Sequence, residues 1–341
     1  MKNVIGNTAA SEVTHAAVKP RWCRRFAAVA IGAMMVTASA VSAQQPNLIV
    51  VTGVAGEPQY TKRFHQWATG LIDAMKLPAT KVHYLAEKPE TTARRATGKS
   101  TRDEVAAAIR TVAAKSQDPI LLVLIGHGSG EGEPRFNLVG PDLTATELNR
   151  MLDAIGDRRV AVINAASASG AFLEPLSAPG RIVVTATRSG LERNETIFAQ
   201  HLVEAFQAGD ADKDGRISLL EAFNYARSEV DRWYREQNRL VTEHAMLEDN
   251  GDGKGSMEPD GRTDGAIART FYLAGAAAVT ATTDPRLRTL YAEKQALEEK
   301  IETLKSMKAG MEEAVYEREL EKLLIDLSLK NQQIRKLEGG R

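Results

Sequence analysis

Cysteine is almost absent from this sequence: Cys23 is the only one among 341 residues. It lies in an N-terminal segment that we expect to be removed. A mature chain without cysteine has no disulfide, no thiolate metal site and no thiol nucleophile. Cysteine-dependent hydrolysis is therefore excluded.

Long hydrophobic runs are also few, and the clearest one lies near the N-terminus. Arg21, Arg24 and Arg25 precede the run "FAAVAIGAMMVTASAV", and small residues follow at 41–43. This order is typical of a secretory signal peptide with its cleavage site. The run is short and rich in Ala and Ser, which favours a cleaved signal over residues 1–43 rather than a spanning anchor. We expect a periplasmic or secreted protein, attached to a membrane only if the signal stays uncleaved.

The chain has no excess of either charge, with 44 Lys and Arg against 44 Asp and Glu. The N-terminal segment 1–43 carries five of the basic residues and one of the acidic ones. The mature chain therefore has 39 basic and 43 acidic residues, a net charge of −4. This mild acidity gives no case for nucleic-acid binding. A phosphate-binding loop is also missing, because "TGVAGEP" has two glycines and no lysine.

Apolar runs alternate with amphipathic helical patterns between residues 44 and 280. The runs are "NLIVVT", "KVHYLA", "PILLVLIG", "RRVAVINA", "RIVVTAT" and, late in the chain, "ARTFYLA" at 268–274. Two of the helices between them begin with capping boxes, Thr101 with Glu104 and Thr144 with Glu147. Wholly apolar strands that alternate with helices predict an α/β domain, with a mostly parallel sheet covered by helices on both faces. Such sheets bind ligands beyond the carboxyl ends of their strands.

The tail, residues 281–341, has a different pattern. From Leu287 onward, apolar or long residues recur at alternating spacings of three and four, a heptad pattern. A second series from Leu320 to Leu337 is out of phase with the first, and the break falls near Gly310. We therefore expect a helical hairpin or coiled coil. It could fold on itself, dock on the domain or pair with another chain, so a protein partner or self-association is expected here.

The stretch "DADKDGRISLLE" matches a twelve-residue EF-hand calcium loop at every position. Gly215 stands at the sharp turn, Ile217 at the apolar eighth position, and helical patterns flank the loop on both sides. A hard cation needs six or seven oxygens, and four carboxylates in one short loop favour a Ca²⁺ site over a solvated acidic turn. The expected ligands are Asp210, Asp212, Asp214, the Arg216 carbonyl, Ser218 and Glu221.

A second acidic turn, "EDNGDGKGSMEPDG", begins at Glu248. Glu248, Asn250 and Asp252 followed by Gly253 copy the first half of a calcium loop. The twelfth position is Pro259, whose side chain cannot bind an ion. The pattern favours a surface loop over a second cation site, and both interpretations stay open.

Two further motifs, "LIGHGSG" and "INAASASGAF", end predicted strands about forty residues apart. Together they resemble the caspase/legumain clan of cysteine peptidases, whose legumain-type sequences read "DHGS" and "EACESGSMF". The residues that match are His127, Gly128 and Ser129 in the first motif and Ser169, Gly170 and Phe172 in the second. The resemblance covers roughly residues 47–206. It implies a caspase-like α/β fold with a histidine and a nucleophile at the ends of neighbouring strands.

The departures from that pattern decide the functional expectation. Ser167 occupies the position of the nucleophilic cysteine, and Ala165 replaces the acidic residue two places earlier. A serine nucleophile needs a base, an orienting acid and an oxyanion hole. The sequence offers only His127 and the amides around Gly128. We favour a non-catalytic binding or scaffold module, and the alternative is a serine-dependent hydrolase that uses Ser167 and His127.

Overall fold

The computed structural model describes residues 45–90, 95–211, 216–274, 284–306, 308 and 311–338. The expected signal peptide, residues 1–43, lies outside these ranges. Within the described residues, no helix is long and apolar enough to cross a membrane.

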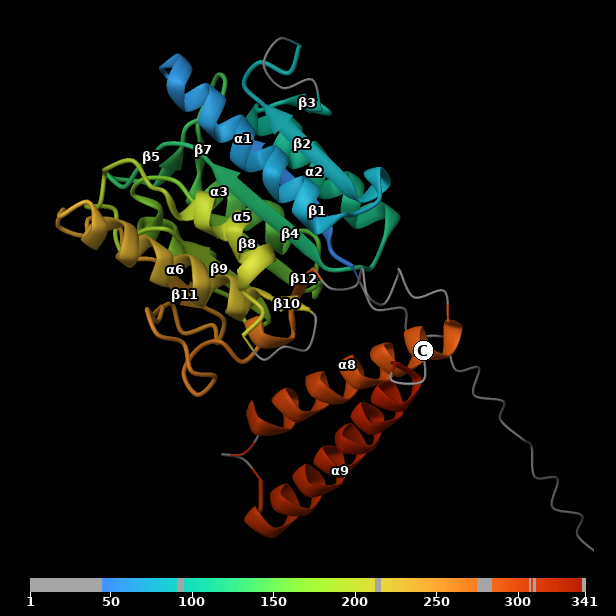
Figure 1. Cartoon of the computed structure of the whole chain (residues 1–341). Coiled ribbons are helices and arrows are strands. Elements are labelled where there is room, and N and C mark those ends of the chain that lie inside the picture. Colours follow the sequence, from blue (N-terminus) through green and yellow to red (C-terminus); the bar gives the residue numbers. More distant parts are fainter. Residues whose placement is uncertain are drawn as a thin grey trace, which may run out of the picture. The chain divides into compact units, whose positions relative to one another are not determined.

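A seven-stranded sheet forms the centre of the domain, in the order β11-β9-β8-β4-β1-β2-β3 (Figure 1). All neighbouring strands are parallel except β11, which runs antiparallel to β9. The central strands β1, β4, β8 and β9 are buried along their whole length, as strands covered on both faces must be. The predicted mostly parallel α/β sheet is therefore confirmed. The strands are β1 (Asn47–Thr52), β2 (Val82–Ala86), β3 (Gly98–Lys99), β4 (Ile120–Ile125), β8 (Val160–Asn164), β9 (Arg181–Thr185) and β11 (Met246–Glu248).

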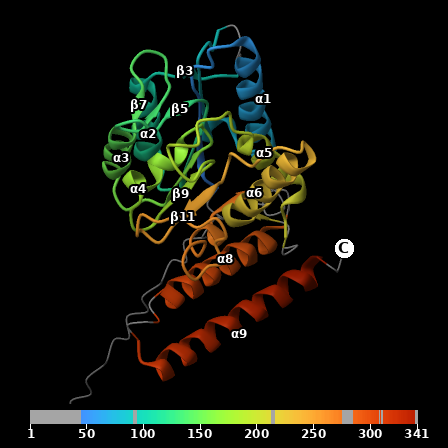
Figure 2. The ribbon, with the colours of Figure 1, turned by 90° about the vertical axis from the view of Figure 1, so that its left-hand side faces the viewer.

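Helices cover both faces of this sheet (Figure 2). One face packs against α1 (Pro58–Met75), α5 (Phe198–Ala208) and α6 (Leu219–Glu236). The other packs against α2 (Arg102–Lys115), α3 (Ala145–Asp153) and α4 (Leu173–Leu176). In α1 the buried residues include Phe64, Trp67 and Leu71, the stripe that the helical spacing predicts.

The two predicted capping boxes form to different extents. At the start of α3 both halves are present, with Thr144 and Glu147 each accepting from the other's backbone amide. At the start of α2 the Thr101 hydroxyl accepts from the Glu104 amide at 3.3 Å. Both helices therefore begin at the residues that the sequence indicates.

The stretch at 268–274 was expected to form one strand, and the structure has a strand only over its last three residues. It forms a short 3₁₀ helix, η3 (Ala268–Thr270), followed by β12 (Tyr272–Ala274). β12 pairs with β10 (Ile217–Ser218) in a separate two-stranded sheet. The Asp249 carboxylate accepts from the amides of Ile267 and Ala268, each at 2.8 Å, and fixes the turn there. The sheet edge beside β9 is occupied by β11 instead.

The tail contains two helices, α8 (Pro285–Ser306) and α9 (Glu313–Glu338). Leu287 and Tyr291 of α8 form a buried cluster with Ile334 of α9. Lys330 of α9 forms an ion pair with Glu293 of α8 at 2.6 Å. The two helices therefore pack against each other, and they are separated where the two heptad series break.

Candidate functional site

His127 and Ser167 follow neighbouring parallel strands, β4 and β8, at the same edge of the sheet. The α3 crossover connects these strands, as the forty-residue spacing predicts. The Gly128 amide donates to Ser167 Oγ at 3.2 Å, and the Ser167 hydroxyl lies 3.5 Å from the Gly128 carbonyl oxygen. Among the described residues, no hydrogen bond joins Ser167 to the His127 ring. The strand ends thus place Ser167 against Gly128, the residue after His127, and the serine bonds to that backbone.

The His127 ring lies against two aromatic side chains of α1. Its edge contacts are with Tyr60, at 4.9 Å between ring centroids, and with Phe64, at 5.2 Å. Burial lowers the pKa of His127, against the opposing pull of the Glu195 charge and the Ala55 backbone. The imidazole is therefore mainly neutral at neutral pH.

An acid that would orient His127 is not part of this arrangement. The Glu195 carboxylate forms a close ion pair with Arg63 of α1, and it acts on His127 only through its charge. No carboxylate in the described part of the chain is hydrogen-bonded to the His127 ring. A serine nucleophile is normally served by a histidine that an acid holds in one tautomer, and that element is missing here.

Ser167 is only 5% exposed, and the segment 187–196 bonds to residues on both sides of it, Ala165 and Ala168. The Glu192 carbonyl accepts from the Ala168 amide at 2.8 Å, which ties this segment to the residue after Ser167. Next to it, a Cβ on Gly130 would lie 2.3 Å from the Gly190 Cα, so the two loops touch backbone to backbone. Ser167 is therefore a buried residue whose neighbours in the chain are tied to the segment 187–196.

A pair of polar residues that joins this segment to the chain before β11 was missed by the sequence analysis. His244 Nδ1 lies 2.6 Å from Glu192 Oε1, and the His244 amide donates to Glu192 Oε2 at 3.2 Å. Arg188 forms an ion pair with the same carboxylate at 3.1 Å. The only sequence signal was the polar stretch "TEHAML" before β11. The pair therefore joins the segment 187–196 to the residues just before β11.

The neighbouring Glu243 is 2% exposed and accepts from the backbone amides of Ile197 and Phe198, at 2.9 and 2.8 Å. It therefore satisfies amides at the start of α5 that have no partner within the helix. Burial raises the pKa of Glu243 to about 8, although the two amides favour the charged form.

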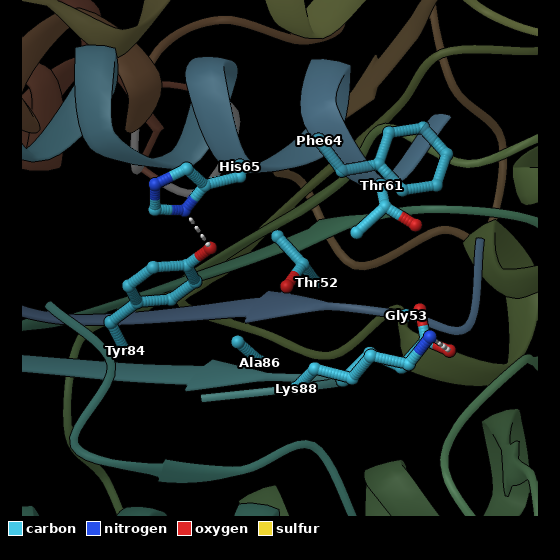
Figure 3. A pocket seen from close by; sticks show the side chains of 9 residues that line it. Thr52, Gly53, Thr61, Phe64, His65, Tyr84, Ala86 and Lys88 are labelled. Atoms are coloured by element: carbon cyan, nitrogen blue, oxygen red, sulfur yellow. Dashed lines mark hydrogen bonds and ion pairs between the residues drawn. The ribbon is translucent and has the colours of Figure 1, made fainter. Parts of the chain in front are cut away.

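A small pocket lies at the carboxyl ends of β1 and β2, beside the His127 site (Figure 3). Phe64 lines it and also contacts His127. Within the pocket, His65 Nδ1 lies 3.1 Å from the Tyr84 hydroxyl. Burial lowers the pKa of His65 and raises that of Tyr84 to about 12, so both groups are neutral near pH 7. A neutral imidazole–phenol pair therefore lies in the pocket, and the charged side chains of Glu87 and Lys88 also line it.

The predicted calcium loop lies between α5 and α6, and its two ends meet. Glu221 Oε1 accepts from the Ala211 amide at 3.1 Å, which joins the twelfth loop position to the second. Glu221 Oε2 accepts from the Ser218 amide and hydroxyl at 2.9 and 2.7 Å. Asp212 and Asp214 lie outside the described residues, whereas Asp210, Arg216, Ser218 and Glu221 lie within them. The described donors fit a hard cation in type and in loop position.

The second acidic turn is buried where it joins the domain and exposed at its tip. Glu248, Asp249 and Asp264 are at most 3% exposed, whereas Asn250 and Asp252 are exposed. Glu248 Oε1 accepts from the Gly251 and Asp252 amides, so its carboxylate is bound to its own turn. Over the described ranges, no group of three or more His, Cys, Asp or Glu side chains could hold a metal ion. That finding does not reach Asp212 and Asp214 of the first loop.

Of three comparisons with known proteins, the one with solved structures finds similarity. A search against protein-family models finds no match, and no curated protein matches the sequence. Among solved structures, the Drosophila initiator caspase Dronc is similar, with a TM-score of 0.41 and 12% identity. The match covers 62% of this chain and 84% of that one.

Proposed function

We propose that this chain is an exported calcium-binding protein whose α/β domain acts without catalysis as a binding or scaffold module. The observation that carries the proposal is the complete twelve-residue loop from Asp210 to Glu221, situated between two helices. Loop charge and flanking rigidity set calcium affinity, and for an exported protein we expect a dissociation constant of about micromolar to millimolar.

The resemblance to the caspase/legumain clan supplies a scaffold and not an activity in this proposal. Ser167 stands where the clan has cysteine, and it is buried and bonded to the Gly128 backbone. His127 is held by aromatic contacts, and Glu195 is paired with Arg63. These contacts favour the non-catalytic role over a serine-dependent hydrolase, because the base and the acid are not arranged around the hydroxyl.

Isothermal titration of the purified chain with CaCl₂ tests the calcium half. We expect one strong site, which Glu221→Gln weakens by about a hundredfold or more, since the twelfth position supplies both carboxylate oxygens. Glu236→Gln is the matched control, because it removes the same charge from the other end of the same helix, α6. Its isotherm should equal that of the wild type. Equal affinities for wild type and Glu221→Gln would overturn the assignment.

A further inference from the structure

Arg216 lies where the calcium loop meets the helical tail. It stands at the seventh loop position, where its carbonyl is an expected ligand of the ion, while its side chain, 5% exposed, extends to other elements. The guanidinium lies over the Tyr272 ring of β12, at 3.8 Å from the centroid. Its Nη2 also lies 3.1 Å from a carboxylate oxygen of Glu298 in α8. One residue therefore serves the loop with its backbone and the tail with its side chain.

Glu298 is the acceptor at the centre of this contact. The Tyr272 hydroxyl donates to it at 2.8 Å, alongside the Arg216 guanidinium. Lys294, one turn earlier in α8, lies 3.6 Å from its other oxygen. The four side chains form a largely buried charged cluster, which is favourable only while each group keeps its hydrogen-bonded partner. The cluster therefore depends on α8 lying against β12.

The backbone of Arg216 is constrained from two sides. It directly precedes β10, which pairs with β12, and the Leu219 amide donates to the Phe271 carbonyl at 2.8 Å. On the other side lies the loop that would surround the ion. A cavity of about 460 Å³ lies beside this junction, lined by Ser218 and Glu221 of the loop and by Ile301 and Leu327 of the tail. The loop and the tail thus share one interface.

We infer that calcium loading of the 210–221 loop and docking of α8 reinforce each other through Arg216, Tyr272 and Glu298. This inference rests on the proposed calcium function. An ion that holds the Arg216 carbonyl fixes the backbone from which the guanidinium reaches Tyr272 and Glu298, so less conformational freedom is lost on docking. Because such coupling is reciprocal, a docked tail raises the calcium affinity by the same factor, about fivefold or more.

Calcium titration of the full chain with Glu298→Gln tests the coupling. The variant should bind calcium about fivefold or more weakly, although Glu298 is not a ligand. Glu293→Gln is the matched control, because it removes the same charge from the same helix but pairs with Lys330 of α9. It should bind as the wild type does. Tyr272→Phe removes one hydrogen bond to Glu298 without changing any charge, and it should weaken calcium binding in the same direction.

Hydrogen exchange provides a second readout. In the wild type, calcium should slow exchange in peptides of α8, and this effect should be lost in both Glu298→Gln and Glu221→Gln. Normal calcium binding in Glu298→Gln and Tyr272→Phe, with α8 exchange independent of calcium, would overturn the coupling and leave the calcium site standing. A wild type that binds no calcium would overturn both proposals.

Discussion

The amide of Gly128 donates a hydrogen bond to the hydroxyl of Ser167, the residue at the nucleophile position, at 3.2 Å. In acyl transfer, a backbone amide beside the nucleophile serves best when it is free to receive a developing oxyanion. Here the buried serine itself uses that amide, and the Glu192 carbonyl is bonded to the amide of the next residue, Ala168. This relationship is the main structural reason for proposing a non-catalytic role.

The bond between Gly128 and Ser167 predicts that Ser167 does not react with a fluorophosphonate probe. Within the described residues no base is hydrogen-bonded to the hydroxyl, and Ser167 is only 5% exposed, so labelling of the wild type should equal that of Ser167→Ala. Peptide and ester hydrolysis should likewise be the same for both proteins. Robust hydrolysis by the wild type that Ser167→Ala abolishes would establish the serine hydrolase instead.

Gly130→Ala should destabilise the fold by about 1–3 kcal/mol, because overpacking forces backbone to move. The added Cβ would lie 2.3 Å from the Gly190 Cα. Chemical denaturation followed by circular dichroism measures the change. Ser129→Ala is the neighbouring control, since it adds no atom and loses only a local bond from the Glu131 amide. An unchanged free energy of unfolding for Gly130→Ala would mean that the two loops are not in contact.

Glu243 should make stability depend on pH. Burial raises its pKa to about 8 from 4.5, so the folded state keeps a proton that the unfolded state releases between those values. Its contribution to the free energy of unfolding is fully present below about pH 4.5 and is lost as pH rises through about 8. Each unit of pKa shift corresponds to about 1.4 kcal/mol, so the loss amounts to a few kcal/mol at most.

Denaturant titrations of wild type and Glu243→Gln at pH 5 and pH 8 measure this effect. The difference in stability between the two proteins should move in favour of Gln at the higher pH, because an amide has no proton to release. The same difference at both pH values would show that Glu243 is charged in the folded state.

The main sheet was predictable because its strands are apolar throughout and its helices carry clear stripes and caps. The positions of His127 and Ser167 followed from the same pattern, since parallel strands end at one edge. β11 was not predictable: it has only three residues, Met246 to Glu248, and it joins the sheet through pairing with a strand more than sixty residues earlier.

The pairing of residues within the site could not be predicted from the sequence either. Glu192 reaches His244, and Glu243 reaches the start of α5, across about fifty residues of chain. No local sequence pattern indicates which partner a carboxylate will bind over that separation. The burial of Asp249 in the second acidic turn was missed for the same reason. Its carboxylate accepts from amides within residues 265–268, which lie well beyond the turn in the sequence. Tertiary contacts determine these pairs.

Thermal unfolding with saturating calcium and with a chelator tests the central claim most directly, with Glu221→Gln as comparator. If calcium binds only the folded chain, about 100 times its dissociation constant adds about 2.7 kcal/mol of stability. The wild-type midpoint should rise with calcium, while the Glu221→Gln midpoint should stay near its value in chelator. In a parallel hydrogen-exchange measurement, calcium should slow amide exchange in both α5 and α6 of the wild type. Identical midpoints for the wild type with calcium and with chelator would contradict the account.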